Sequence, residues 1–179
     1  MSLESNKTLG GVGAILIAIG SFVPIIALIG IILVLIAMKG LADHYNERPI
    51  FDNALYGFIF GIIGIVAALA IFVMAFVSGA ILADPLASIG GLLVALAVAF
   101  IFLLLSAIFY RKSFTLISAK SGEKMFDTAG LLLLLGAILT IVLIGFILWF
   151  IGWILAAVGF FSIKTPTTQP SPSPPPPPP

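Results

Sequence analysis

The sequence predicts an all-α fold, a polytopic helical membrane protein with six helical segments. The chain of 179 residues is 61% hydrophobic and only 8% charged, whereas soluble domains carry roughly 25% charged residues. Four uncharged stretches are each longer than the ~20 residues that cross a hydrocarbon core, namely residues 8–38, 53–83, 85–110 and 128–163. Continuous apolar runs favour helices over a membrane β-barrel, whose strands of ~10 residues alternate in hydrophobicity.

Each of the first and last runs is too long for one untilted membrane span and too short for two full spans. As a helix, residues 8–38 would measure about 46 Å at ~1.5 Å per residue, against a hydrocarbon core of ~30 Å. The stretch GSFVP, Gly20–Pro24, contains a proline that interrupts helical hydrogen bonding. In the last run LTIVLIG, Leu139–Gly145, is a softer break. We therefore predict two hairpins at the ends of the chain and two single spans between them.

Charge favours these six segments over the alternative of four spans. Lys and Arg concentrate on the cytoplasmic side of membrane proteins. If both end runs are hairpins, all eight basic residues lie on one side and both termini are cytoplasmic; with four spans, the first and last of them fall outside. We expect a multi-pass protein of the cell membrane with its basic residues in the cytoplasm: Lys7, Lys39, Arg48, Arg111, Lys112, Lys120, Lys124 and Lys164.

Proline content divides the chain into a helical transmembrane domain, residues 1–164, and a disordered proline-rich tail, residues 165–179. Nine of the 12 prolines lie between Pro166 and Pro179, and such a composition favours extended polyproline II. We interpret the tail as a flexible stalk. The alternative is that it is a ligand for a protein partner with a proline-recognising groove.

The charged stretch MKGLADHYNERPIFDNAL, Met38–Leu55, contains the only histidine of the chain. Asp43, His44 and Glu47 could in principle meet as a metal or acid–base site. However, the HExxH spacing is absent and there is no second histidine. The competing interpretation is a polar loop between two membrane helices, and we adopt it.

Capping residues fit this loop interpretation. Lys39 would neutralise the C-terminal end of the second helix, and Gly40 would loosen it. Asp52 or Asn53 would then cap the next helix. The stretch RKSFTLISAKSGEKMFD, Arg111–Asp127, is interpreted as a second polar loop on the same side, with its basic residues near anionic headgroups.

The sequence lacks the residues that several classes of function require. There is no cysteine, which removes thiolate sites, and the net charge of +1 without a basic stripe argues against nucleic acid. No Asp, Glu, Lys, Arg or His lies within the four runs, although ion-coupled transporters usually place one there. We therefore predict no catalytic, cofactor-binding or metal-binding residues and expect a non-enzymatic binding or scaffold protein.

Two other functions remain as alternatives. A small-solute transporter or channel would fit the over-long runs at both chain ends, a layout found in transporters with repeated halves. GAIL occurs at Gly13–Leu16 and again at Gly136–Leu139, which is compatible with such a repeat. The second alternative is a membrane enzyme that uses the loop around His44.

Small residues recur at helical spacing in three of the predicted segments. They allow the close backbone approach on which helix association in lipid depends. We interpret them as packing within one chain, with a homo-oligomer as the alternative. The three sets are Gly57, Gly61, Gly64 and Ala68; Gly91, Ala95, Ala99 and Ser106; and Gly152, Ala156 and Gly159.

Three stretches carry a family resemblance, namely KTLGG at Lys7–Gly11, KGLADHYNERPIFDNAL at Lys39–Leu55 and GFFSIK at Gly159–Lys164. With the apolar segments between them, they resemble the archaeal and bacterial membrane proteins of domain-of-unknown-function family 996. The resemblance covers nearly everything before the proline tail. It implies an integral membrane protein, of archaeal origin, and brings no activity, substrate or site residue.

Overall fold

The computed structural model describes residues 2–20, 23–82 and 85–164, which form six α-helices and one short 3-10 turn, without a strand in these ranges. The predicted tail, residues 165–179, lies outside the described residues. The elements are α1 (Leu3–Gly20), α2 (Pro24–His44), α3 (Pro49–Leu82), α4 (Pro85–Ser121), α5 (Met125–Leu139), η1 (Thr140–Val142) and α6 (Gly145–Ser162).

Both predicted breaks occur where the sequence places them. The first apolar run is divided between Gly20, where α1 ends, and Pro24, where α2 begins. The last is divided between Leu139 and Gly145 by η1, and Leu143 follows η1 with a left-handed φ of 64°. The prediction of six segments is confirmed, and the alternative of four unbroken spans is wrong. Five helical segments of the described chain are long and apolar enough to cross a membrane, namely α2, α3, α4, α5 taken together with η1, and α6.

The polar loops are shorter than the sequence suggested. Helix α2 continues through Lys39 and Gly40 to His44, so the expectation that Gly40 loosens the helix end is wrong. The reason is tertiary packing: Gly40 lies directly against the buried side chain of Asn6 on α1. Tertiary contacts of this kind override the low helix propensity of glycine.

Helix α3 also begins earlier than expected. It starts at Pro49, because proline is favoured in the first turn, where its missing N–H costs nothing. Asp52 and Asn53 therefore lie within the helix instead of capping it, and Asn53 Nδ2 donates a hydrogen bond to Pro49 O at 2.7 Å. Likewise α4 runs to Ser121, so most of the predicted second loop is helical.

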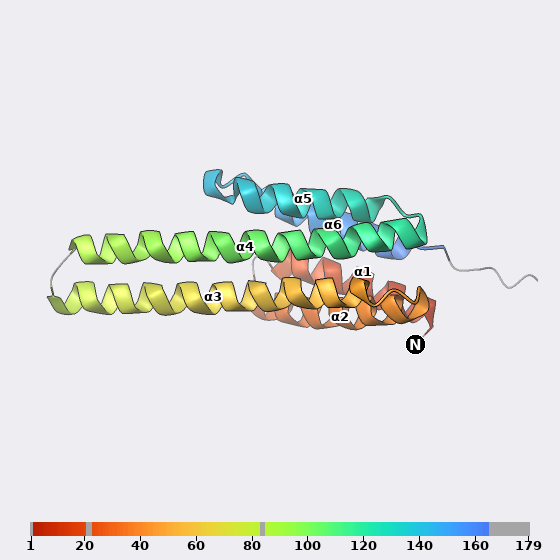
Figure 1. Cartoon of the computed structure of the whole chain (residues 1–179), viewed down its shortest axis with the longest axis horizontal. Helices are drawn as coiled ribbons and strands as arrows, with labels where there is room; N and C mark the ends of the chain where they lie inside the picture. The colour runs from red at the N-terminus through yellow and green to blue at the C-terminus, as the bar shows by residue number, and fades with distance from the viewer. Residues whose placement is uncertain (1, 21–22, 83–84, 165–179) are drawn as a thin grey trace, which may run out of the picture.

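The helices form two regions of different thickness. Each helix packs against the next along the chain, and α1 also packs against α6, which closes a six-helix ring. The long helices α3 and α4, of 34 and 37 residues, extend well beyond this ring as an antiparallel pair (Figure 1). The end hairpins, α1–α2 and α5–α6, therefore flank only one half of the central hairpin.

Glycine contacts hold each end hairpin together. A Cβ placed on Gly13 would lie 2.7 Å from Gly30 O, and one on Gly30 would lie 2.6 Å from Gly13 O. In the other hairpin a Cβ on Gly136 would lie 3.0 Å from Gly145 O. The first glycine of each GAIL segment thus occupies a helix crossing. Close backbone approach of this kind gives dispersion and Cα–H···O contacts, which replace the hydrophobic effect in lipid.

An aromatic cluster joins the central hairpin to α5 and α6. The Trp153 ring meets Tyr110 and Phe114 of α4 edge-on, with centroid separations of 5.4 and 6.0 Å. Phe126 on α5 then lies between Phe114, at 5.8 Å, and Phe160, at 5.0 Å. All five side chains are buried. Edge-to-face pairs at these distances add about 0.5–1.5 kcal/mol each beyond area burial.

The crossing of α1 and α2 gives a direct test of this packing. We expect Gly13→Ala to lower the free energy of unfolding by about 1–3 kcal/mol, because the new methyl group must displace the α2 backbone. Gly90→Ala is the matched control, since a Cβ there meets nothing within 4 Å, and it should be neutral or stabilise by up to ~1 kcal/mol. Unfolding in detergent micelles, followed by circular dichroism, measures both; equal stability of the two variants would contradict the crossing.

Candidate functional site

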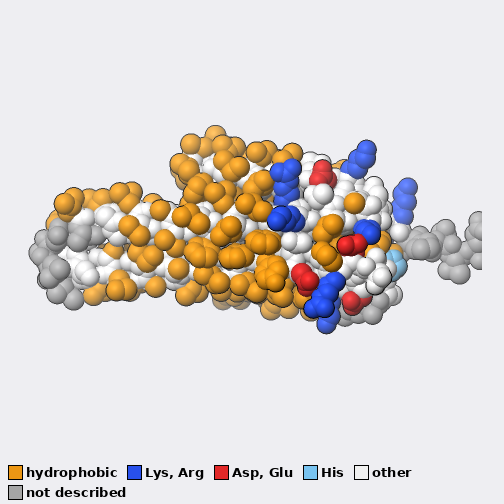
Figure 2. Space-filling model, viewed as in Figure 1, with side chains coloured by type: hydrophobic (Ala, Val, Ile, Leu, Met, Phe, Trp, Pro, Cys, Tyr) orange, Lys and Arg blue, Asp and Glu red, His pale blue; other side chains and the backbone are white. Residues whose placement is uncertain are grey.

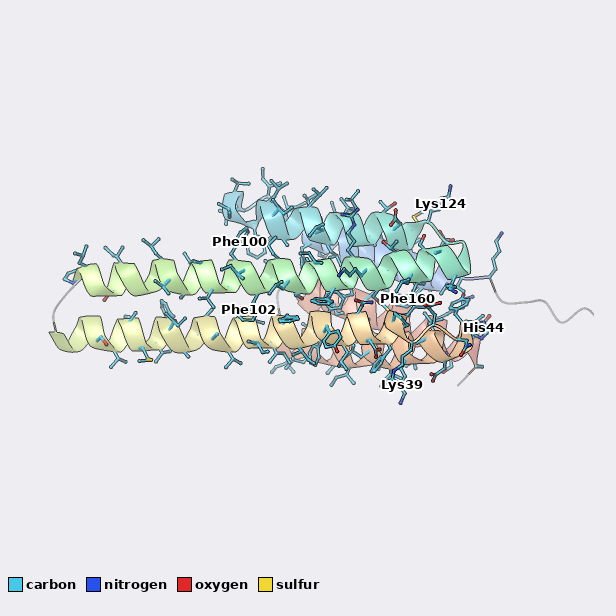
Figure 3. The ribbon with its side chains drawn as sticks, viewed as in Figure 1. Lys39, His44, Phe100, Phe102, Lys124 and Phe160 are labelled. Atoms are coloured by element: carbon cyan, nitrogen blue, oxygen red, sulfur yellow. The ribbon has the colours of Figure 1, made fainter. Side chains whose placement is uncertain are left out.

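Charged side chains gather at one end of the molecule, where both termini of the helical domain and the α2–α3 and α4–α5 turns lie (Figures 1 and 2). The rest of the visible surface is apolar. Lys39, His44 and Lys124 are all at this end (Figure 3). This arrangement leaves two places to examine for function: the charged end and the apolar interior.

The charged end does not assemble the residues that the sequence singled out. Asp43 and His44 are exposed at the end of α2, and the His44 ring meets the edge of Tyr45 at 5.0 Å. Glu47 lies beyond the end of the helix and pairs instead with Lys120, with 2.7 Å between Oε2 and Nζ. Nowhere in the described ranges do three His, Asp or Glu side chains come together to hold a metal ion.

The two polar turns are joined to each other. Besides the Glu47–Lys120 ion pair, the buried Ser113 Oγ donates a hydrogen bond to Ile50 O at 2.6 Å. Thr115 Oγ1 donates to Asp127 Oδ1 at 3.0 Å. These contacts tie the start of α3 and the start of α5 to the last turns of α4. At the charged end, an ion pair and hydrogen bonds therefore connect the two polar turns with helices α3, α4 and α5.

The interior holds a cavity of about 800 Å³ between the end hairpins and the middle of the central hairpin. Every helix except α5 lines it, and so does the residue pair Thr140 and Ile141 of η1. Aliphatic residues, glycines and aromatic side chains form its wall, and one of the aromatic residues, Phe100, is labelled in Figure 3. The aromatic members are Phe58, Phe100, Tyr110, Phe146, Trp149 and Trp153.

The cavity wall is uncharged. None of its described lining residues is Asp, Glu, Lys, Arg or His. Two of its hydroxyls are already committed, since Ser106 Oγ donates to Gly57 O and Thr140 Oγ1 donates to Gly136 O, both at 2.7 Å. A volume within the ~300–1,000 Å³ of small-molecule sites, with mostly apolar walls, suits an apolar ligand.

The cavity opens between the helices toward their outer surface. Several residues that line it are also substantially exposed, among them Ile65 at 63% and Phe146 at 61%. These residues lie on α3 and at the start of α6, close to the turn of the α5–α6 hairpin. In a membrane this opening would face hydrocarbon.

Comparison with known proteins places the chain in a family. The family model described as "Protein of unknown function (DUF996)" matches residues 26–154. The chain belongs to the DUF996 family. It is also similar to an uncharacterized protein of Methanocaldococcus jannaschii, with 31% identity over 166 residues, which is 91% of this chain and 94% of the relative. No solved structure matches.

Small residues singled out from the sequence as helix-packing faces also line the cavity of this DUF996 protein, namely Gly57, Gly61, Gly64, Ala99 and Ser106, but its aromatic residues were not singled out. The available signal is that the chain has only two tryptophans, Trp149 and Trp153, spaced four apart on one face of α6. Aromatic residues in an apolar run are indistinguishable from ordinary membrane sequence without the helix packing. Tyr110 gives a similar weak signal, as the last residue before the basic pair at 111 and 112.

The small-residue faces of the DUF996 chain pack against its own helices. A Cβ on Gly57 would lie 3.1 Å from Ser106 O, and Gly64 lies directly against Phe102, a side chain between α3 and α4 (Figure 3). Gly91 packs against Ala75 in the same hairpin. Packing within one chain thus accounts for these faces, and a homo-oligomer stays a separate prediction.

A metal-binding test examines the His44 stretch. We expect the DUF996 protein to bind Zn²⁺ no more tightly than its His44→Ala and Asp43→Ala variants do, because the neighbouring carboxylates are not gathered around the imidazole. Both substitutions should also change the free energy of unfolding by less than ~0.5 kcal/mol, as usual for exposed positions. Equilibrium dialysis measures the first; a loss of zinc binding in either variant would contradict the loop interpretation.

Proposed function

We propose that this DUF996 protein is a non-enzymatic membrane protein that binds an uncharged, lipid-like ligand in the cavity between its hairpins. The observation that carries the proposal is the cavity of about 800 Å³ with an uncharged, aromatic-rich wall. A charged ligand would lose its hydration there without gaining a counter-charge, at a cost of several kcal/mol. An apolar chain would instead meet only dispersion contacts.

The lengths of the helices support entry of the ligand from the bilayer. Helix α5, with 15 residues, is about 22 Å long, and α1 and α6, with 18 each, are about 27 Å. The charged first turns of α1 and α5, and Lys164 just after the end of α6, belong outside the hydrocarbon core of ~30 Å. The apolar turn of the α5–α6 hairpin would then lie within the core, and its backbone is satisfied locally by bonds such as Leu143 N to Thr140 O.

Two observations support a non-enzymatic role. Among its described lining residues the cavity has no carboxylate, imidazole or ammonium group to transfer a proton near neutral pH. The charged end has carboxylates and one imidazole, but Glu47 is engaged by Lys120, and the His44 ring meets its neighbour Tyr45 edge-on. Partial burial also raises the pKa of Tyr45, so its phenol stays protonated and is a poor base.

A transporter of an apolar solute is the second candidate. It is favoured by the position of the cavity at the level where both end hairpins turn, since its lining includes Gly20 and Ala27 of one and Thr140 and Leu143 of the other. Binding without transport and binding with transport differ in one measurement. Purified protein in liposomes would move a labelled apolar solute between leaflets faster than empty liposomes only in the second case.

The orientation belongs to the same proposal. The basic residues gather at one end of the molecule (Figure 2), which by the positive-inside tendency would face the cytoplasm. The chain lacks cysteine, so single cysteines at Leu86, Ser121, Leu143 and Ser171 report position. On intact cells, a membrane-impermeant thiol reagent should label Leu86→Cys alone.

Each of the other three positions tests a separate part of the topology. Ser121→Cys and Ser171→Cys should react only after permeabilisation, because the charged end and the tail are expected to be cytoplasmic. Leu143→Cys should stay unlabelled under both conditions, because the α5–α6 turn would lie in hydrocarbon. Labelling of Ser121→Cys on intact cells would reverse the orientation, and labelling of Leu143→Cys from outside would mean that the hairpin crosses the whole bilayer.

Ligand binding can be read from intrinsic fluorescence. Both tryptophans line the cavity, so dibromooctadecane bound there should quench the emission, and octadecane should restore it by competition. Gly61→Leu should abolish this displaceable quenching, because a Cβ on Gly61 has room, 3.4 Å from Ser106 Oγ, and the longer side chain would fill the cavity. Gly90→Leu is the matched control outside the cavity.

The comparison of these two glycine variants decides the proposal. Quenching that is lost in Gly61→Leu and kept in Gly90→Leu would support binding in the cavity. Quenching that octadecane cannot displace, or that both variants retain, would come from probe dissolved around the protein and would refute it.

A further inference from the structure

Two buried side chains that line the cavity carry hydrogen-bond donors without a partner among the described residues. Trp153 is only 1% exposed, and its Nε1 has no hydrogen-bond partner in the described part of the chain. Tyr110 is 5% exposed, and its hydroxyl donates no hydrogen bond to any described residue. An unpaired polar group in an apolar interior costs roughly 1–3 kcal/mol. Both residues line the cavity, and their rings touch at 5.4 Å.

The two side chains lean toward the same space from different helices. Long side chains on a helix point back toward its N-terminus. Helix α4 begins at the far tip of the central hairpin, and α6 begins at the turn of the α5–α6 hairpin. Tyr110 and Trp153 therefore both lean away from the charged end and toward the cavity. They form its polar floor, whereas the opposite wall is apolar, with residues such as Ile65 and Leu96.

The polar side chains at the floor of the cavity differ in whether they already donate a hydrogen bond to the protein. Ser106 lies one helical turn from Tyr110 and also lines the cavity, but its Oγ donates to Gly57 O at 2.7 Å. Its proton is used, and the carbonyl it satisfies belongs to the facing helix. At the floor Tyr110 and Trp153 keep a proton to offer, and the half-buried Trp149, one helical turn nearer the start of α6, carries a third. Tryptophan can only donate, so the group that binds here must include an acceptor.

From this geometry we infer that the ligand is a single-chain amphiphile with an uncharged oxygen head, such as a long-chain alcohol or ketone, held by Tyr110 Oη and Trp153 Nε1. The inference rests on the proposed function, because it places the head of the ligand whose apolar chain fills the cavity. The head lies toward the charged end, and the chain extends between the hairpins toward hydrocarbon. A carboxylate head is disfavoured, since no cation lines the cavity to compensate its charge.

The test compares three probes that differ only in the head group. Dibromostearyl alcohol, dibromooctadecane and dibromostearic acid are titrated separately into the full-length protein in detergent, and tryptophan emission is measured. The alcohol should bind about 2- to 10-fold more tightly than the alkane, the gain expected for one or two neutral hydrogen bonds. The ionised acid should bind less tightly than the alcohol.

Tyr110→Phe removes the hydroxyl and keeps the ring that packs on Trp153 and Phe114. It should reduce the preference for the alcohol over the alkane at least 2-fold without weakening the alkane. Trp153→Phe should do the same, with Trp149 as the remaining reporter. Tyr56→Phe is the matched control, because Tyr56 is exposed on α3 against Phe109 and does not line the cavity.

The outcomes separate this inference from the proposed function. Equal affinity for alcohol and alkane in the unsubstituted protein, or tighter binding of the acid, would overturn the oxygen-head inference while cavity binding stands. If none of the three probes gives quenching that a competitor can displace, the proposed function itself is overturned. A preference that Tyr110→Phe leaves intact would show that another group holds the head, and would also overturn the inference.

Discussion

Close backbone contact at glycine is the constraint on which the rest of the structure depends. In hydrocarbon, apolar side chains gain little by leaving lipid for protein, so helices associate through dispersion and weak polar contacts. Gly13 against Gly30 and Gly136 against Gly145 let the backbones of each end hairpin come into direct contact. Once the hairpins are closed, α1 can reach α6 and complete the ring that includes α3 and α4.

The aromatic cluster links this ring to the cavity. Trp153 contacts Tyr110 and Phe114 and also lines the cavity. Phe126 and Phe160 continue the cluster toward the charged end, and Phe160 packs on Gly10 of α1. The close aromatic packing on the side of the charged end and the open space on the other side therefore result from the same arrangement of helices. The shape of the cavity floor is set by residues that also hold α4, α5 and α6 together.

Sequence reasoning predicted the class of fold and the hairpins, because uncharged run lengths and the proline at position 24 depend on local chemistry alone. It failed at the helix ends: Gly40 stays helical since Asn6 packs on it, and Pro49 begins α3 before Asp52 can cap it. The cavity could not be predicted from the sequence, for a different reason. Whether Tyr110 and Trp153 face each other, lipid or a void depends on contacts between helices far apart in the sequence, and one amino-acid sequence of uniformly apolar runs carries no record of them.

The unequal lengths of the hairpins have a consequence for the surrounding membrane. Around its perimeter the protein presents a tall apolar wall at α3 and α4 and a short one at the end hairpins (Figure 1). Lipids adapt to such hydrophobic mismatch by stretching or compressing, at fractions of a kcal/mol per Å. The annulus of lipid would thus be thick on one flank and thin on the other. Such an asymmetric hydrophobic mismatch would favour tilting of the protein. It would also favour accumulation of the protein in bilayer regions where thickness already varies.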